Sequence, residues 1–403
     1  MVESKPVLRA LVNGAGPTGA LTAFALADAG WQVQISDPLP AAVLLERSRA
    51  YAFTHSSQRL LEQLGLWSAV QAVLVPFRSL ELLDLATQRQ VPFCLADLGS
   101  RRAAAPAAAV GWVGQHRPLM TLLLERLGAH PAITLELGTP PHAAAKQPPH
   151  DLIVAADGPH SPSREALGIG AFQWAYRQNC LTALVQLRGS ADDQAWELLR
   201  PEGPFAVLPL GDGLFQLVWS APAQRCRQLE SLGDSAFLDA LAGALPDQLQ
   251  PDALLDDPRA FPVALLLARR LHRGHTVLVG ESGHRCHPVG GQGLNLCWRD
   301  VATLHRLARR ATAGRLAVHR LPAAYARRRW PDLLLTLLAT DLLVRFFSNR
   351  SPLLLPLRHL ALLLLAKLAP LRHLALLLLA KLAPLRQLSL SAMTDGPCQL
   401  LRR

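Results

Sequence analysis

The chain has 403 residues, which is enough for two domains and a large hydrophobic core. Its formal net charge of +11 indicates a basic surface, which attracts nucleic acids, anionic cofactors and anionic lipids alike. Because no zinc-finger, helix-turn-helix or RNA-binding signature accompanies the arginines, we expect no nucleic-acid partner.

The cysteines and the start of the chain indicate a cytoplasmic protein. No two cysteines have CxxC spacing, which is typical of reduced thiols rather than of a disulfide framework. No apolar stretch precedes the first predicted strand, so we expect no signal peptide. Leucine-rich runs such as residues 360–366 are much shorter than the ~20 residues that a membrane-spanning helix needs.

The first predicted elements form a nucleotide-binding unit. Residues 7–13 are an apolar run that predicts a buried strand, and Gly14, Gly16 and Gly19 follow it in the pattern GxGxxG. Gly14 permits the tight turn, Gly16 lets the backbone approach a pyrophosphate, and Gly19 allows a helix to pack closely on the strand. This pattern predicts a dinucleotide site.

The helix and the strand after these glycines complete the unit. Pro17 and Thr18 stand at the start of an Ala/Leu-rich helix, and a helix start offers unpaired N–H groups to phosphates. A second strand over residues 32–36 then leads to Asp37, whose carboxylate can accept hydrogen bonds from ribose hydroxyls. We therefore include Pro17, Thr18 and Asp37 in the candidate cofactor site.

A second acid follows a predicted strand in the run DLIVAADG, residues 151–158. Asp157 and Gly158 end this strand, at the position where a cofactor crosses the strand ends of an open α/β sheet. Two alternatives stay open: Asp157 could cap a turn, and Arg164 in the following predicted helix could be a surface cation.

The chain does not continue with the alternating strands and helices of a simple dehydrogenase. Residues 180–189 and 203–222 alternate like antiparallel strands, with a predicted hairpin turn at Gly211-Asp212-Gly213. Residues 231–245 predict a helix over that sheet, and residues 261–274 predict a strand that leads back to the first domain. We therefore expect a second, β-rich domain.

A glycine-rich loop joins a predicted strand to a predicted helix between residues 277 and 300. The apolar run 277–279 leads to Gly280 and Glu281, and the helix is predicted from about Leu294, with Asn295 as a candidate side-chain cap. Glycines in the loop let the backbone approach a flat ligand. The candidate ligand-binding residues of the loop are Pro288, Gly290, Gly291 and Gly293.

Motifs spread over residues 7 to about 310 resemble those of the FAD-dependent aromatic hydroxylases, a family that includes para-hydroxybenzoate hydroxylase and the ubiquinone-biosynthesis hydroxylases. They are GAGPTG at 14–19, SRAYAFTHSSQRLLEQLGLW at 48–67, DLIVAADGPHSPSREALGI at 151–169, and the loop HPVGGQGLN at 287–295. The ubiquinone-biosynthesis hydroxylases are the closest match.

The resemblance also implies roles for individual residues. Arg49 would reach the FAD, and Gln115 in the segment 110–127 would contact the flavin side. Asp157, Gly158, Ser161 and Arg164 would lie near the FAD pyrophosphate and the approach of the nicotinamide nucleotide. The family usually has Asp where this chain has Glu281, and that acid hydrogen-bonds the ribityl chain, so the longer stem of Glu281 leaves the geometry of this contact open. The positive end of the helix after the loop would stabilise the charge of reduced flavin.

The expected fold class is α/β. A Rossmann-like FAD-binding domain is expected from residues 1–70, 108–168 and 274–320, with an inserted antiparallel β-sheet substrate domain from residues 71–107 and 169–273. A C-terminal helical region is expected over residues 321–403.

The C-terminal region contains an identical tandem repeat of PLRHLALLLLAKLA, at 356–369 and 370–383, which suggests a recent in-frame duplication. Leucines run almost all the way round such a helix, so it either packs on the FAD-binding domain or lies on a membrane surface. In the second interpretation, the cations that would contact lipid headgroups are Arg358, His359, Lys367, Arg372, His373 and Lys381.

We therefore expect an FAD-dependent monooxygenase that uses NAD(P)H and O2 to hydroxylate a small aromatic or quinol-like lipid substrate, such as a prenylated phenol or quinol. An FAD-dependent reductase or cyclase acting on an isoprenoid lipid is the alternative, and a flavoprotein kept only for binding is a third. His284, Cys286 and His287 lack a fourth ligand at a usual spacing, so we expect no metal site. No catalytic base can be assigned, and the oligomeric state stays open. The expected location is cytoplasmic, with the inner face of the membrane as an alternative.

Overall fold

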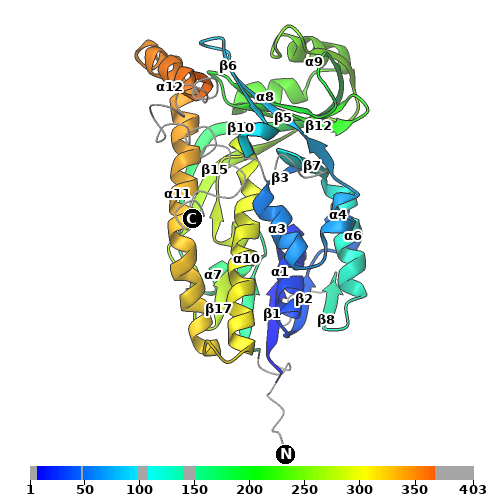
Figure 1. Ribbon diagram of the computed structural model, residues 1–403, viewed down its shortest axis with the longest axis vertical. Helices are drawn as coiled ribbons and strands as arrows, with labels where there is room; N and C mark the ends of the chain where they lie inside the picture. The colour runs from blue at the N-terminus through cyan, green and yellow to red at the C-terminus, as the bar shows by residue number, and fades with distance from the viewer. Residues whose placement is uncertain (1–6, 47–48, 99–107, 139–149, 368–403) are drawn as a thin grey trace, which may run out of the picture.

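The computed structural model describes residues 7–46, 49–98, 108–138 and 150–367. A mostly parallel sheet with helices against it forms one half of the molecule, and a larger sheet forms the other (Figure 1). The second copy of the tandem repeat, including Arg372, His373 and Lys381, lies outside the described residues.

The first sheet is parallel, apart from one antiparallel pair at its edge between β16 and β17. Its strands lie in the order β16 (His272–Arg273), β17 (Thr276–Leu278), β9 (Leu152–Ala155), β1 (Arg9–Asn13), β2 (Gln32–Asp37) and β8 (Ile133–Leu137). Because parallel strands share an orientation, the carboxyl ends of β1, β2, β9 and β17 meet at one edge. Ligands bind at this edge in open α/β sheets.

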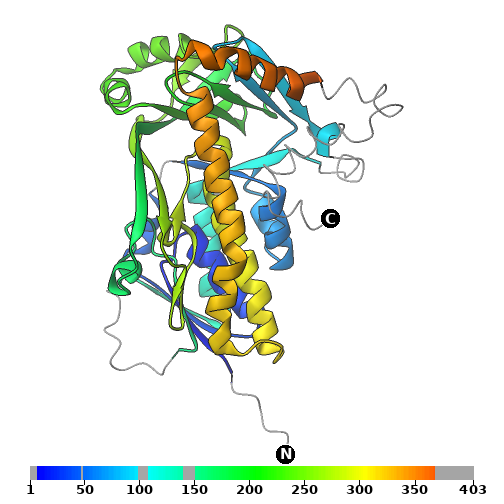
Figure 2. The same ribbon diagram turned by 90° about the vertical axis from the view of Figure 1, so that its left-hand side faces the viewer.

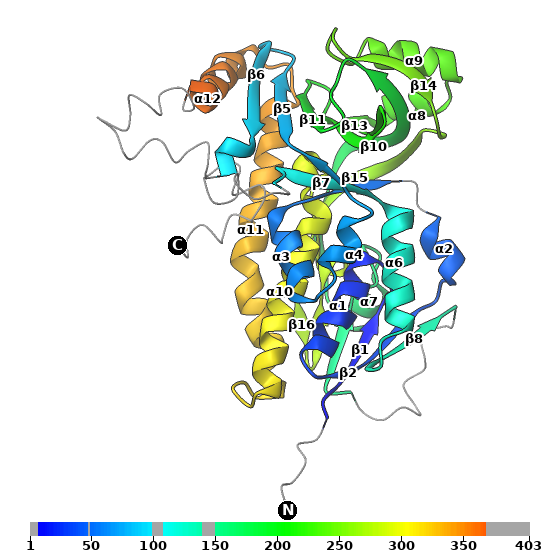
Figure 3. The same ribbon diagram turned by 45° about the vertical axis from the view of Figure 1, so that its right-hand side comes forward.

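Helices cover this sheet and fill its core. The helix α1 (Pro17–Asp28) lies between α6 (His116–Gly128) and α10 (Gln292–Thr312) and contacts both (Figure 3). The α1 residues from Gly19 to Leu26 are all buried, which explains why this helix is apolar all the way round. The shorter helices of this half are α2 (Ala41–Leu45), α3 (His55–Gln63), α4 (Trp67–Gln71) and α7 (Pro162–Ala166).

A small antiparallel sheet connects the two halves. Its strands are β3 (Ala50–Phe53), β7 (Gly111–Gln115) and β4 (Val75–Phe77). Because β4 pairs with β7, the chain enters the large sheet only after Phe77, with β5.

The large sheet has the order β18 (His284–Arg285), β15 (Arg259–Ala268), β10 (Ala171–Arg188), β13 (Leu214–Pro222), β12 (Phe205–Gly211), β11 (Gln194–Leu199), β5 (Ser79–Asp84) and β6 (Arg89–Cys94), with β14 (Gln250–Leu254) also on β10. The predicted hairpin is present as β12 and β13. The expectation of an antiparallel sheet holds except for β5 and β11, which are parallel. These two strands come from distant segments of the chain, so no hairpin forces them to run antiparallel.

The two faces of the large sheet have different surroundings. One face packs under α8 (Ala223–Glu230) and α9 (Asp234–Ala242), with Trp196, Phe215 and Trp219 among the side chains of this core. The helix α9 is the one predicted over residues 231–245. The opposite face carries the residues of the cavity described below.

The C-terminal helices run along one side of the molecule. The long helix α11 (Leu321–Phe347) lies beside α10, and α12 (Leu355–Lys367) crosses the top next to β6 (Figure 2). No helix within the described part of the chain is both long enough and apolar enough to span a bilayer.

For Arg358, the structure contradicts the membrane-surface interpretation. Arg358 is fully buried, and its guanidinium donates to the carbonyl oxygens of Phe346 (2.6 Å) and Asn349 (3.2 Å) at the end of α11. Carbonyl oxygens at a helix end lack partners within the helix, and here Arg358 and the Asn349 side chain (3.1 Å) both donate to the Phe346 carbonyl oxygen. His359, the next residue, is hydrogen-bonded to Arg89 of β6.

Candidate functional site

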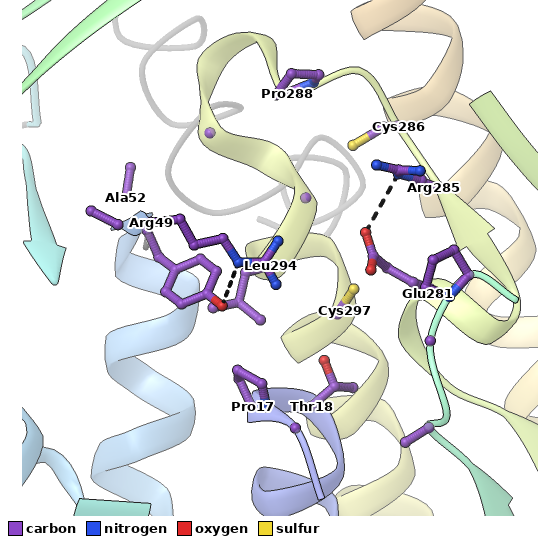
Figure 4. Close-up of a pocket in the computed structure, with 18 of the residues that line it drawn as sticks. Pro17, Thr18, Arg49, Ala52, Glu281, Arg285, Cys286, Pro288, Leu294 and Cys297 are labelled. Carbon is purple, nitrogen blue, oxygen red and sulfur yellow. Dashed lines mark hydrogen bonds and ion pairs between the residues drawn. The ribbon is translucent and has the colours of Figure 1, made fainter. Parts of the chain in front are cut away.

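A cavity of about 670 Å³ lies between the carboxyl edge of the first sheet and the large sheet. This volume falls within the range of roughly 300–1,000 Å³ that is typical of small-molecule sites. Candidate residues that line it are Gly14, Gly16, Pro17, Thr18, Asp37, Arg49, Asp157, Gly158, Glu281, Pro288, Gly290, Gly291, Gly293 and Leu294. Motifs from four distant parts of the chain therefore meet around one space (Figure 4).

The three glycines of the first motif have different environments. A Cβ atom on Gly14, whose φ is +101°, would lie 2.4 Å from the carbonyl oxygen of Ala156, and one on Gly19 would lie 1.8 Å from the carbonyl oxygen of Gly14. A Cβ on Gly16 would meet no protein atom within 4 Å. Gly14 and Gly19 are therefore required by the packing of the protein itself, whereas Gly16 keeps space free beside the start of α1.

Asp37 is buried at the end of β2 and braces the neighbouring loops. Its carboxylate accepts hydrogen bonds from the backbone N–H of Ala15 (2.8 Å) and of Leu39 (2.9 Å). A carboxylate has about four acceptor positions, so these two bonds leave capacity for a ligand hydroxyl. Asp37 thus holds the glycine turn in place and still faces the cavity.

Asp157 caps the turn after β9, which is one of the two alternatives open from the sequence, and it also lines the cavity. Its carboxylate accepts from the Ser161 hydroxyl and from the Ser163 backbone N–H (2.9 Å). Arg164 is not a free surface cation, since its guanidinium donates to the carbonyl oxygens of Ser282 (2.8 Å) and Pro159 (3.0 Å). Arg164 therefore ties this turn to the segment that contains Glu281.

Arg49, the residue before β3, extends into the cavity (Figure 4). Its Nε donates to the Tyr51 hydroxyl (3.0 Å), which in turn is 2.8 Å from Nδ1 of His116. Burial opposes the positive charge, but Tyr51 and the carboxylate of Glu281 raise the pKa of Arg49 above its ordinary value. The guanidinium is therefore a fixed positive charge at the wall of the cavity.

The segment after β17 turns sharply at Gly280, whose φ is +70°. Glu281 follows with its side chain 39% exposed, and its carboxylate is 3.7 Å from the Nε of Arg285 (Figure 4). The residue before α10 is Gly291, which adopts the left-handed conformation and has no side chain. The backbone N–H groups at the start of α10 are therefore not capped by a side chain. This helix start is open to negative charge on a ligand.

Asn295 has a different role from the expected helix cap. Its amide donates to the carbonyl oxygens of Ala52 and Gly291, both at 2.7 Å, and its Oδ1 accepts from Thr54 and Ser57. Asn295 is buried and fastens α10 to β3 and α3 rather than facing the cavity.

The remaining candidates do not line the large cavity. Gly19 and Gly280 pack against protein atoms, as the close approaches to Gly14 and to Thr18 show. Gln115 lines a smaller cavity of about 330 Å³, which shares Arg49 with the large one.

Two features of the site escaped the sequence patterns. The first is Glu197 on β11, which lines the cavity from the large sheet. The second is a buried ion network behind the Glu281 segment. Asp300 accepts from the Gly280 N–H (2.8 Å), lies 2.6 Å from Nε2 of His284, and accepts from Nε of Arg329 (2.5 Å). No local signal in the sequence marks either residue, because their partners come from distant elements.

The network continues from α10 to α11 and fixes the charge of Asp300. Arg329 also donates to Asp332 (2.6 Å), and Arg299 donates to the same carboxylate (2.9 Å). Burial favours the neutral acid, but His284 and Arg329 hold the pKa of Asp300 well below its usual range. The network therefore locks the turn at Gly280 to both C-terminal helices.

These residues fit an FAD. The open space at Gly16 and the start of α1 suit a pyrophosphate, and the carboxylates of Asp37 and Glu281, which line the same cavity, can accept hydrogen bonds from hydroxyl groups of a ribose or ribityl chain. The uncapped start of α10 and the glycines before it suit a flat ring that gains negative charge.

Comparisons with known proteins agree with this fit. A model of the FAD binding domain family matches residues 8–139 and 149–331. The 3-demethoxyubiquinol 3-hydroxylase of Escherichia coli is 31% identical over 385 residues, covering 90% of this chain and 95% of that protein. The ubiquinone hydroxylase UbiL of Rhodospirillum rubrum is 32% identical over 361 residues, covering 84% of this chain and 81% of that protein.

Solved structures show the same fold at lower identity. Klebsiella pneumoniae HpxO, in a complex with FAD and uric acid, superposes with a TM-score of 0.69 at 19% identity, covering 88% of this chain and 92% of that one. Pseudomonas aeruginosa PqsL, described as a probable FAD-dependent monooxygenase, superposes with a TM-score of 0.70 at 19% identity, covering 85% and 97%.

Proposed function

The chain belongs to the FAD-dependent aromatic hydroxylases, a family of FAD-binding monooxygenases, and from this premise we propose that it hydroxylates the ring of a prenylated phenol or quinol with NAD(P)H and O2. The relatives named as ubiquinone hydroxylases support a substrate of the ubiquinone-precursor type.

The single observation that carries this proposal is the continuity of the cavity. It extends from the glycines of the nucleotide edge to an apolar wall formed by the large sheet and its neighbours, with Phe77, Ala206, Leu208, Val218, Phe261 and Val263. An apolar wall favours a substrate with a hydrocarbon side chain, because burial of apolar surface stabilises the complex. One space can therefore hold a dinucleotide and an apolar aromatic molecule side by side.

The protein binds and orients the cofactor and the substrate, while the cofactor supplies the redox chemistry. When bound, FAD accepts hydride from the nicotinamide and activates O2, so that one oxygen atom reaches the substrate and the other leaves as water. We assign the pyrophosphate to Gly16 and the start of α1, and the ribose hydroxyls to Asp37. Arg49 and the start of α10 supply positive potential where the reduced ring needs it.

The proposal is tested with the FAD-loaded protein, NADPH or NADH, ortho-prenylphenol and isotopically labelled O2. We expect oxidation of the nicotinamide that depends on the phenol, and a product that has gained one labelled oxygen atom by mass spectrometry. An isomer without added oxygen would instead identify a cyclase, and a product with added hydrogen would identify a reductase. Absence of turnover with any prenylated phenol or quinol would leave only the binding interpretation.

Glu281 offers a direct test of the cofactor assignment. We expect Glu281→Ala to weaken FAD binding by about tenfold or more, because a hydrogen bond to a charged group contributes ~1.5–3 kcal/mol. Glu281→Asp should weaken FAD binding less than Glu281→Ala, because it keeps a carboxylate. Some loss of affinity is still expected, since Asp300 and Arg164 hold the turn and the backbone cannot move to compensate for the shorter side chain. The measurement is a fluorescence titration of FAD-free protein with FAD.

The matched control for Glu281 is Glu165→Ala, which removes an exposed acid of α7 that does not line the cavity. This control should bind FAD like the wild type. If Glu281→Ala also binds FAD like the wild type, Glu281 has no contact with the cofactor.

Contact of the C-terminal helices with a membrane surface stays a prediction. It is favoured by Leu334, Leu338 and Leu342, which recur every four residues on α11 and are each more than half exposed. We expect the protein to sediment with vesicles of anionic phospholipid, and Leu338→Glu with Leu342→Glu to lower the bound fraction. Equal sedimentation with and without vesicles would exclude the contact.

A further inference from the structure

Glu197 brings an acid into the apolar part of the cavity. In β11, Trp196 and Leu198 point into the core under α8 and α9, whereas Ala195 and Glu197 point to the opposite face. Glu197 is only 8% exposed and lines the cavity. A buried carboxyl group in such a position carries a desolvation cost, so its presence needs a reason beyond packing.

The surroundings of Glu197 are almost entirely apolar. In register with it lie Ala206 of β12 and Leu82 of β5. Among the cavity-lining residues that the described strands β5 and β10 to β15 contribute, Glu197 alone is ionisable. The other polar side chain of that wall, Thr182, has its hydroxyl 3.4 Å from the carbonyl oxygen of Arg259. Substrate bound against this wall would therefore meet one acid.

Glu197 is also connected to the glycine loop that precedes α10. The backbone N–H of Gly290 favours the charged form of its carboxyl group. Gly290 lines the same cavity and belongs to the loop that we assign to the ring of the cofactor. The carboxyl group thus lies where the nucleotide part and the apolar part of the cavity meet.

Burial raises the pKa of Glu197 to about 7, and the backbone N–H of Gly290 opposes part of this rise. One titratable side chain of the same sheet interacts electrostatically with it: the thiol of Cys180 on β10, which burial keeps neutral by raising its pKa to about 12. Because the pKa is raised, the carboxylate predominates above about pH 7 and the neutral acid below it.

We propose that Glu197 is the general base that takes the proton from the ring hydroxyl of the substrate. This inference rests on the proposed function. The O–H bond of the phenol breaks, a new O–H bond forms on the Glu197 carboxylate, and the electron pair stays on the phenol oxygen. From there it delocalises into the ring and raises electron density at the ortho and para carbons, which is what attack on an electrophilic oxygen requires.

The test compares Glu197→Gln with the wild type in the FAD-loaded enzyme, with ortho-prenylphenol as the probe. We expect hydroxylation above pH 7 to slow by about 100-fold or more, in line with the loss of a general base. FAD content and reduction of the flavin by NAD(P)H should be retained. The fall of kcat/KM on the acid side near pH 7 should be present in the wild type and absent in the variant.

The matched control is Glu81→Gln on β5. Glu81 is a buried acid of the same sheet, but it is hydrogen-bonded to Gln90 and does not line the cavity, so the acid-side fall should persist in this variant. A ring-fluorinated ortho-prenylphenol, whose hydroxyl ionises more readily, should narrow the gap between Glu197→Gln and the wild type. A merely structural role for Glu197 would leave that gap unchanged.

Two outcomes separate this inference from the function on which it rests. If the wild type gives no oxygenated product from the phenol, the proposed function fails and the inference fails with it. If the wild type and Glu197→Gln give product at equal rates, only the inference fails. Should Glu197→Gln not fold, Glu197→Asp takes its place: it keeps a carboxylate on a shorter stem, so the acid-side fall should persist while the rate drops, and an unchanged rate would overturn the inference.

Discussion

Replacing Asp300 by asparagine should lower the free energy of unfolding by about 3–5 kcal/mol, the usual effect of breaking a buried ion pair. Asp300 is fully buried, and its carboxylate lies within hydrogen-bond distance of the Gly280 N–H, His284 and Arg329. Asparagine has nearly the same shape but no charge, so the buried Arg329 keeps only Asp332 as its partner. The measurement is urea unfolding of the FAD-free protein, which separates this effect from cofactor binding.

The control for Asp300 is Arg188→Gln, which breaks an exposed pair with Asp252. The Arg188 side chain is 75% exposed, so we expect a loss below ~1 kcal/mol. A loss of that small size for Asp300→Asn would mean that the network contributes little.

The same network predicts a dependence of stability on pH. The pKa of Asp300 is lowered in the folded state. Its carboxylate therefore contributes fully to the free energy of unfolding above the ordinary pKa of an aspartate, and this contribution is lost as the pH falls through the folded-state pKa. The acid-induced loss of stability should therefore be smaller in Asp300→Asn than in the wild type.

Gly19→Ala should lower the stability of the protein, whereas Gly16→Ala should lower its affinity for FAD and leave stability unchanged. At Gly19, a Cβ would lie 1.8 Å from the carbonyl oxygen of Gly14, a backbone atom that cannot give way cheaply, so we expect a loss of at least ~1–3 kcal/mol in the free energy of unfolding. At Gly16, a Cβ meets no protein atom within 4 Å, so stability should stay within ~0.5 kcal/mol of the wild type. FAD affinity should nevertheless fall strongly at Gly16, because the methyl group occupies space that we assign to the pyrophosphate.

The two effects are separated by unfolding the FAD-free variants and by titrating each with FAD. Gly128→Ala, at the end of α6 with no atom within 4 Å of the added Cβ, should change neither quantity. If Gly16→Ala binds FAD normally, the pyrophosphate does not lie against this residue, and the assignment of the nucleotide edge is wrong.

Much of the site was predictable because it depends on the backbone near each motif. Gly14, Asp37, Asp157 and Gly280 follow apolar strands in the sequence, and parallel pairing brings the ends of such strands to one edge. The α/β class, the hairpin at residues 211–213 and the helix α9 also follow from local periodicity and turn chemistry. These features need no knowledge of which distant segment packs where.

Side chains whose partners are distant were not predictable. In the sequence, Glu197 reads as the polar residue of an ordinary strand, and only the pairing of β11 with β5 and β12 turns its face to the cavity. Arg358 reads as a cation for a lipid surface, yet it satisfies carbonyl oxygens at the end of α11. Gln115 follows a family motif but faces the smaller cavity.

The physical reason lies in the range of the interactions. Turns, helix starts and strand ends follow from steric and hydrogen-bonding preferences of neighbouring residues, so the nucleotide edge can be read directly from the chain. The destination of a side chain depends on sheet register and helix packing, which join residues far apart: Asp300 meets Arg329 of another helix, and Glu197 meets Gly290 of another domain segment. The family and the cofactor edge thus follow from the order of residues, whereas the proposed base and the network behind the turn at Gly280 depend on how the folded elements pack.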